Sequence, residues 1–149
     1  EITTRLVGSE MCIRDRITKE EIFEFRRVME KAVCSNLIAK GLSYEYESIL
    51  ETKLEEMKLF DGKDLTDVDK EFHDTLIQAT GNHLWAVLME AVTDAYRDWI
   101  NYVIELADES VRVKLLQCHA DIYQNLEQKN EPAMLLAIDR HYDLIEQMV

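Results

Sequence analysis

Residues that interrupt helices are scarce in this sequence. Its 149 residues include only four Gly and one Pro, too few for the many tight turns of a β-sandwich or a β-barrel. Apolar residues instead recur at the spacing of an amphipathic helix, as they do after the capping box formed by Thr18 and Glu21. We therefore predict an all-α fold, an antiparallel bundle of about six helices joined by short connections.

Capping residues and glycines indicate where the predicted helices begin and end. Gly41 ends the first helix, a turn at Gly62 ends the second, and a cap at Thr66 begins the third. The fourth helix is long, and Asn130 opens the last one. The predicted helices cover approximately residues 18–40, 43–60, 66–81, 84–106, 109–128 and 130–149.

The composition excludes some classes of partner. Thirty acidic residues against seventeen basic ones give a formal net charge of −13, so the general field of the chain repels nucleic acid and anionic membranes. Three Cys without paired spacing are typical of a reduced, intracellular protein. No apolar run approaches the ~20 residues that cross a bilayer, and no signal peptide opens the chain. We expect a cytoplasmic protein that does not bind membranes.

The first sixteen residues differ in character from the rest of the chain. They have little apolar periodicity, and their charges cancel. The stretch SEMCIRDR, from Ser9 to Arg16, resembles the translation of a sequencing-library adapter. This favours a non-native segment, and a disordered tail is the alternative. We predict that residues 1–16 lie outside the fold and that residues 17–149 form one domain of ordinary length.

Three of the four His stand where a core residue is expected. His73, His119 and His141 have apolar residues three and four places away on the same helix face, and Asp69 lies one turn before His73. A single such His is commonly a hydrogen-bonded core residue. Together, however, these groups would each cost about 1–3 kcal/mol if buried without a partner. A shared divalent metal satisfies all four, because imidazole and carboxylate are its usual ligands.

The residues around this predicted site also resemble a known family. The run from Asp69 to Asn82, D-K-E-F-H followed by A-T-G-N, looks like the signature of the FCD domain. That domain is the C-terminal effector-binding part of FadR-type GntR transcription regulators. The run from Glu24 to Glu30 resembles its E-x-R-x-x-[IL]-E start, and His119 and His141 stand where the family has two further histidines. The resemblance extends from about residue 18 to the end of the chain.

The resemblance implies a helical bundle around a cavity floored by a divalent metal (Zn, Ni or Mn). The implied metal ligands are Asp69, His73, His119 and His141. Family members bind small organic or sugar acids, whose carboxylate meets the metal and a basic side chain nearby. Arg26 matches that basic residue, although pairing with Glu30 on a solvent-facing surface would explain it equally. Asn82 is a second candidate for effector binding, and an N-cap of the fourth helix is its alternative role.

The family further implies a homodimer that contacts DNA only through a winged helix-turn-helix domain, which is missing here. Two positions depart from the family pattern. His83 replaces a proline, and we interpret it as a surface or loop histidine. Cys118 replaces an acidic residue, and we expect it to pack in the core rather than to bind the metal.

Three functions remain open on these residues. The first is a ligand-sensing regulatory domain, which is not an enzyme. The second is a helical metal-dependent hydrolase, because His73-Asp74 is an H-D dipeptide of the kind that helical phosphohydrolases use. Those enzymes also have a His well upstream of the dipeptide, however, and this sequence has no His before residue 73. The third is a structural helical bundle without a ligand.

Overall fold

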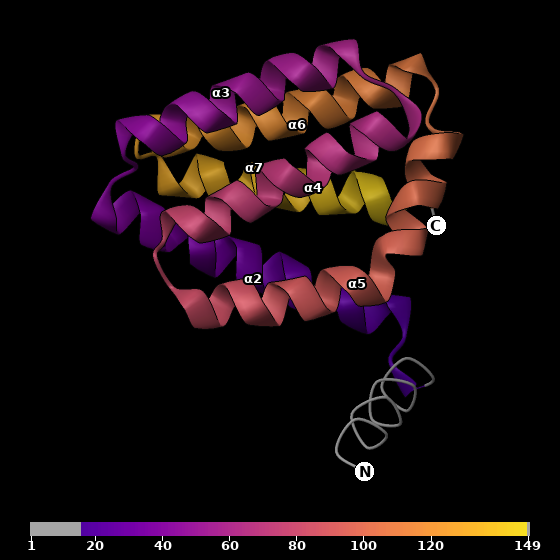
Figure 1. Ribbon diagram of the computed structural model, residues 1–149, viewed down its shortest axis with the longest axis horizontal. Helices are drawn as coiled ribbons and strands as arrows, with labels where there is room; N and C mark the ends of the chain where they lie inside the picture. The colour runs from indigo at the N-terminus through magenta and orange to yellow at the C-terminus, as the bar shows by residue number, and fades with distance from the viewer. Residues whose placement is uncertain (1–15, 149) are drawn as a thin grey trace.

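The computed structural model describes residues 16–148. Six complete helices follow one another within these residues, which contain no β-strand, and short connections join them (Figure 1). This confirms the predicted all-α bundle. The helices are α2 (Lys19–Lys40), α3 (Tyr44–Leu59), α4 (Gly62–Ala79), α5 (His83–Leu106), α6 (Glu109–Glu127) and α7 (Glu131–Glu146).

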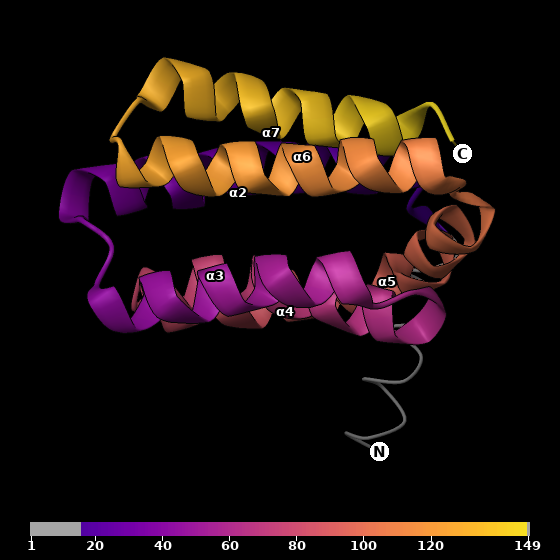
Figure 2. The same ribbon diagram turned by 90° about the horizontal axis from the view of Figure 1, so that it is seen from above.

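The helices pack in two layers. One layer contains α2, α6 and α7, and the other contains α3, α4 and α5 (Figure 2). Within the layers, α6 packs along α7, α3 along α4, and α4 along α5. Both layers contribute to one core cluster of almost fully buried side chains, which includes Leu37, Leu50, Phe72, Ile122 and Ile138. Burial of this apolar surface is the main contribution to the stability of the bundle.

Side-chain caps begin several helices where the sequence predicts them. In α2, the amide of Glu21 donates to Oγ1 of Thr18 at 3.2 Å, and the amide of Thr18 donates to the Glu21 carboxylate at 2.8 Å. Ser43 and Asn130 cap α3 and α7 in the same sense. These side chains satisfy amide groups that have no partner inside the helix, which is why such boundaries are readable from sequence.

The start of α4 differs from the prediction. The helix begins at Gly62 rather than at Thr66, because Gly62 takes a φ of 52° and reverses the chain within a single residue. Thr66 is not a cap but lies inside the helix, where its hydroxyl donates to the carbonyl of Gly62 at 3.2 Å. The additional turn brings Lys63 and Thr66 to a cavity described below.

Arg27 connects α2 to α7 through its guanidinium. Nη1 donates to the carbonyl oxygen and to Oδ1 of Asp139, at 3.2 and 2.9 Å. Nη2 donates to Asp143 at 2.8 Å and to Glu146 at 3.1 Å. The Arg27 side chain is only 19% exposed, so these contacts are partly shielded from water. Three carboxylates from α7 therefore hold one cation of α2 in place.

Replacing this cation is expected to destabilise the fold. Arg27→Met keeps an apolar side chain but loses the hydrogen bonds to charged groups, so it should lower the free energy of unfolding by about 1.5–3 kcal/mol. Arg140→Met, on the exposed face of α7, is the matched control and should change it by less than about 0.5 kcal/mol. Urea unfolding followed by circular dichroism measures both. Equal effects of the two substitutions would contradict a specific role for Arg27.

Candidate metal centre

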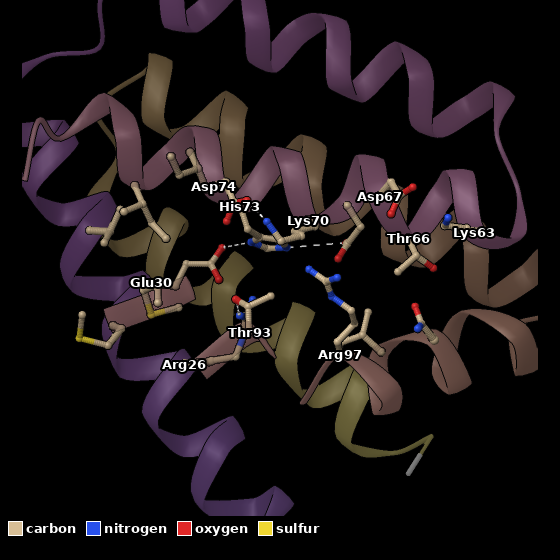
Figure 3. Close-up of a pocket in the computed structure, with 18 of the residues that line it drawn as sticks. Arg26, Glu30, Lys63, Thr66, Asp67, Lys70, His73, Asp74, Thr93 and Arg97 are labelled. Carbon is tan, nitrogen blue, oxygen red and sulfur yellow. Dashed lines mark hydrogen bonds and ion pairs between the residues drawn. The ribbon is translucent and has the colours of Figure 1, made fainter. Parts of the chain in front are cut away.

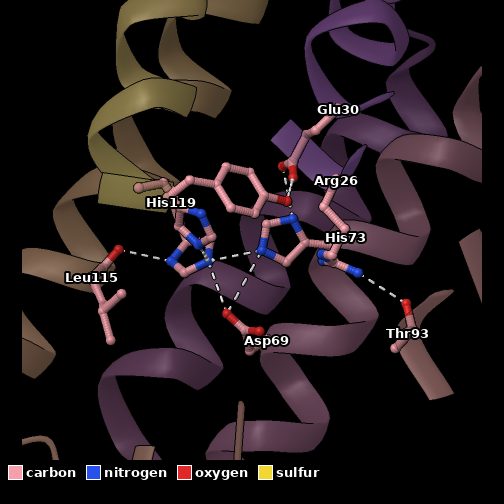
Figure 4. A network of polar contacts seen from close by, with 9 residues as sticks. Arg26, Glu30, Asp69, His73, Thr93, Leu115 and His119 are labelled. Carbon is pink, nitrogen blue, oxygen red and sulfur yellow. Dashed lines mark hydrogen bonds and ion pairs between the residues drawn. The ribbon is translucent and has the colours of Figure 1, made fainter. Parts of the chain in front are cut away.

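Three helices bring the four predicted ligands to one point. Asp69 and His73 lie one turn apart on the inner face of α4, and an i,i+4 pair of this kind projects in one direction. His119 comes from α6 and His141 from α7. The three His are 6%, 2% and 1% exposed, in chain order. Four polar side chains therefore converge inside the bundle (Figure 4).

The ligand atoms lie close to the separations that one bound cation would impose. Nε2 of His119 is 3.2 Å from Nε2 of His73 and 3.1 Å from Nε2 of His141. Oδ1 of Asp69 is 2.9 Å from the same His119 nitrogen and 3.7 Å from that of His73. All four atoms lie within 4.8 Å of one another. Two ligands bound to one ion at roughly 2.1 Å are at most about 4.2 Å apart, so a single divalent ion would bind this group after its widest pair moved closer by a few tenths of an ångström.

The hydrogen bonds made by Nδ1 of His73 and of His119 show which ring nitrogen of each faces the centre. Nδ1 of His73 lies 2.7 Å from the Glu30 carboxylate, and Nδ1 of His119 lies 2.7 Å from the carbonyl of Leu115. Both partners can only accept, so each Nδ1 carries the proton. Nε2 of each ring is then the atom that faces the centre, and if both rings are neutral their lone pairs oppose each other at 3.2 Å. A cation between them would turn this repulsion into attraction.

Glu30 is a site residue that the sequence pattern did not reveal. It is 6% exposed, and its carboxylate accepts from His73 and from the hydroxyl of Tyr142 (Figure 4). The solvent-facing part of the alternative interpretation of Arg26 and Glu30 is therefore wrong, whereas the charge of Arg26 does act on the Glu30 carboxylate and helps to lower its pKa. The signal that could have found it is its place at the end of the same E-x-R-x-x-M-E run, three residues before the buried Val33.

The charges of the centre hold its carboxyl groups ionised. Burial alone would raise the pKa of Glu30, but attraction to His73 outweighs it and lowers that pKa to about 2. Burial opposes charge on His73 as well, yet the negative charges of Glu30 and Asp69 raise its pKa to about 10, so without a metal this ring holds a second proton, on the Nε2 atom that a bound metal ion would take over. Burial and the neighbouring imidazoles lower the pKa of His141 well below its usual range. The centre thus combines carboxylates with imidazole, the donor set of a divalent metal site.

A cavity opens beside this centre, between α2, α4 and α5. Its volume is about 320 Å³, and its lining includes Asp69, His73 and Glu30 (Figure 3). Arg26 faces it from α2, is 4% exposed, and donates from Nη1 to the hydroxyl of Thr93 at 3.0 Å. A solvent-facing Arg26 is therefore excluded. The cavity places a buried guanidinium near the predicted metal ligands, in a space large enough for a small molecule.

Most of the chain matches a known protein family. The family model described as FCD domain matches residues 21–144. The chain belongs to the FCD family. The FCD domain is the effector-binding region of GntR-family regulators, and its members belong to regulators rather than to enzymes. No curated protein matches the sequence.

No helix in the described part of the chain is long and apolar enough to cross a membrane.

Three other residues singled out in the sequence lie outside the centre of this FCD domain. Asn82 is exposed and caps α5, accepting from the amides of Leu84 and Trp85 at 3.1 and 3.2 Å. It is not among the residues that line the cavity, which favours its capping role. His83 is exposed at the start of α5, as expected. Cys118 is half-buried and is not part of the candidate metal-binding group.

Proposed function

We propose that residues 17–149 form the effector-sensing domain of a FadR-type GntR transcription regulator. A divalent metal, Zn, Ni or Mn, would be held by Asp69, His73, His119 and His141. The effector would be a small organic or sugar acid. The observation that carries the proposal is the convergence of four ligand atoms within 4.8 Å at a cavity that also contains the buried Arg26.

The proposed effector is an anion because the cavity would present two positive groups to it. When bound, the metal supplies Lewis-acid positions that its four protein ligands leave open for a carboxylate oxygen. Arg26 is positioned by Thr93, and a guanidinium binds a second carboxylate oxygen or a hydroxyl well. Glu30 and Asp69 carry the compensating negative charge on the protein side. Binding would order α2 and α4 against each other and so pass a signal along α2.

A hydrolase is the second candidate function, and the structure offers it less support. In an H-D dipeptide of that kind, the aspartate would bind the metal together with the histidine. Asp74 instead pairs with Lys70 on α4, and the candidate metal-binding group contains Asp69 in its place. The same residues therefore favour a sensor that binds without catalysis.

The proposed regulator would be a cytoplasmic homodimer that reaches DNA through a separate domain. Leu84, Val87 and Leu88 support the dimer: they form one stripe on α5 and are 65%, 64% and 43% exposed, and contiguous exposed apolar side chains are typical of protein interfaces. A second copy of the chain would cover this stripe. Sedimentation of the protein as a monomer at micromolar concentration would contradict this part of the proposal.

Thermal shift measurements test the proposed effector site. Citrate, malonate and gluconate are suitable probes, and at a hundredfold excess over its Kd a ligand stabilises by about 2.7 kcal/mol, or roughly 5–10 °C in Tm for a domain of this size. We expect at least one probe to give such a shift. The shift should disappear after chelation of the metal and in Arg26→Gln, but not in the control Arg140→Gln. A shift that survives metal removal would contradict the anchoring mechanism.

Glu30→Gln tests the hydrogen bond behind His73. A carboxylate that accepts from a metal-bound His fixes its ring and increases its basicity, so we expect this substitution to weaken metal binding about 10–100-fold. Glu24→Gln, on the exposed side of α2, should leave the affinity unchanged. Competition with a chromophoric chelator measures both constants. Unchanged affinity in Glu30→Gln, with native circular dichroism, would show that Glu30 has only a packing role.

A further inference from the structure

A second cavity lies at the end of the bundle where α3 ends and α6 begins. Its volume is about 290 Å³, close to the roughly 300 Å³ at which small-molecule pockets begin. It shares only Asp69 with the cavity that contains Arg26, and His119 also lines it. The two cavities therefore approach the candidate metal centre from different helices: the first between α2, α4 and α5, the second between α3, α4, α5 and α6.

The walls of this second cavity are mainly apolar. Four helices contribute them, so the cavity is a feature of the tertiary structure rather than a groove along one helix. The apolar side chains that line it are Met57, Phe60, Leu65, Ile104, Val113, Leu115 and Leu116. Such a lining favours an aliphatic ligand over a polyhydroxylated one, because hydroxyl groups would lose their hydrogen bonds to water without gaining others.

Arg112 is the cation of this cavity that forms no ion pair with another described residue, although the carboxylates of Glu109 and Asp69 also line the cavity. Its Nε atom is buried and has no hydrogen-bond partner among the described residues. Glu109 lies one turn before it on α6 and also lines the cavity, yet no ion pair joins the two in the described part of the chain. The other cation, Lys58, is bound to Glu55 at 2.8 Å. A buried guanidinium nitrogen without an acceptor is costly, and an anionic ligand would satisfy it.

We propose that this cavity is a second ligand site, for an aliphatic monocarboxylate of medium chain length. The carboxylate would accept hydrogen bonds from Arg112, and the alkyl chain would lie along the apolar walls that include Met57, Ile104 and Leu116. This ligand class differs from the polar acids proposed for the Arg26 cavity. The site needs no metal, because the cation that binds the carboxylate belongs to α6.

Calorimetric titration with sodium octanoate tests the site in the metal-free chain and in the metal-loaded chain. We expect binding of about one equivalent in both, with octanol binding much more weakly because it lacks the charge. Arg112→Gln should weaken octanoate binding at least about tenfold, as expected for a lost charge-assisted hydrogen bond. Lys114→Gln, an exposed cation of the same helix, is the matched control and should have no effect.

A second substitution separates the two cavities. Val113 is 57% exposed at the edge of the second cavity, so Val113→Trp should block it without disturbing the core. Octanoate binding should then be lost while the response to citrate remains. Absence of octanoate binding, or binding that requires the metal and Arg26 but not Arg112, would overturn the proposal. Failure of the citrate response alone would contradict only the function proposed for the first cavity.

Discussion

The double substitution His119→Ala and His141→Ala should reduce bound metal from about one equivalent to less than about a tenth of one. It removes two of the three imidazoles and leaves Asp69 and His73, a pair on one turn of α4. Two ligands from one helix bind a divalent ion far more weakly than four from three helices, because the bundle holds those four in place before the ion arrives. Elemental analysis by mass spectrometry after dialysis measures the metal content.

The exposed histidine of the same chain provides the control for this experiment. His83→Ala should keep the full equivalent, since His83 lies at the start of α5 and outside the candidate group. Circular dichroism should show native helix content for both proteins, so that loss of metal is not loss of fold. Retention of metal by the double variant, or its loss from His83→Ala, would show that the ligand assignment is wrong.

Phe72→Ala should destabilise the fold more than Arg27→Met does. Phe72 is 0% exposed, and its ring meets those of His73 and His119 edge to face at centroid distances of 5.5 and 5.1 Å. Its removal leaves a cavity beside the centre, so we expect a loss of about 3–5 kcal/mol in the free energy of unfolding. Urea unfolding in the presence of a chelator measures this loss independently of the metal.

Phe25, a second phenylalanine of the same chain, provides the control for the Phe72 substitution. Phe25 lies on α2 and is 41% exposed, so Phe25→Ala should cost less than about 1 kcal/mol. In the metal-loaded protein, Phe72→Ala should also weaken metal binding, because His73 and His119 lose the ring that packs against both. Destabilisation of the two variants by similar amounts would contradict a core that is centred on Phe72.

The parts of the site predicted from sequence are those that follow helix periodicity. Asp69 and His73 share a face because they are four residues apart, and His119 and His141 are buried because their own neighbours at helical spacing are apolar. The same periodicity predicts α4 itself but not its first turn. Helix α4 begins at Gly62, which has a positive φ. The sequence does not predict this conformation, because glycine permits many others.

Contacts between distant helices do not follow from periodicity. Glu30 has a basic residue four positions before it, which is also the pattern of a solvent-exposed ion pair. Only the packing of α2 against α4 and α7 shows that its partners are His73 and Tyr142. Arg112 is similar, since nothing in its local sequence distinguishes it from a surface residue. The residues that surround it belong to four helices, and the apolar periodicity of a single helix does not predict how four helices pack together.

The position of Arg26, Arg27 and Glu30 along α2 leads us to expect that a ligand in the cavity would tilt this helix about Arg27. Arg27 fastens one side of it to α7, while Arg26 and Glu30 face the cavity from within one turn of the same point. Thr18 lies nine residues before Arg27, about 13.5 Å along the axis. A tilt of about 5° at Arg27 would therefore displace the first turn of α2 by about 1 Å, so occupancy of the cavity would change the position of Thr18 relative to α7.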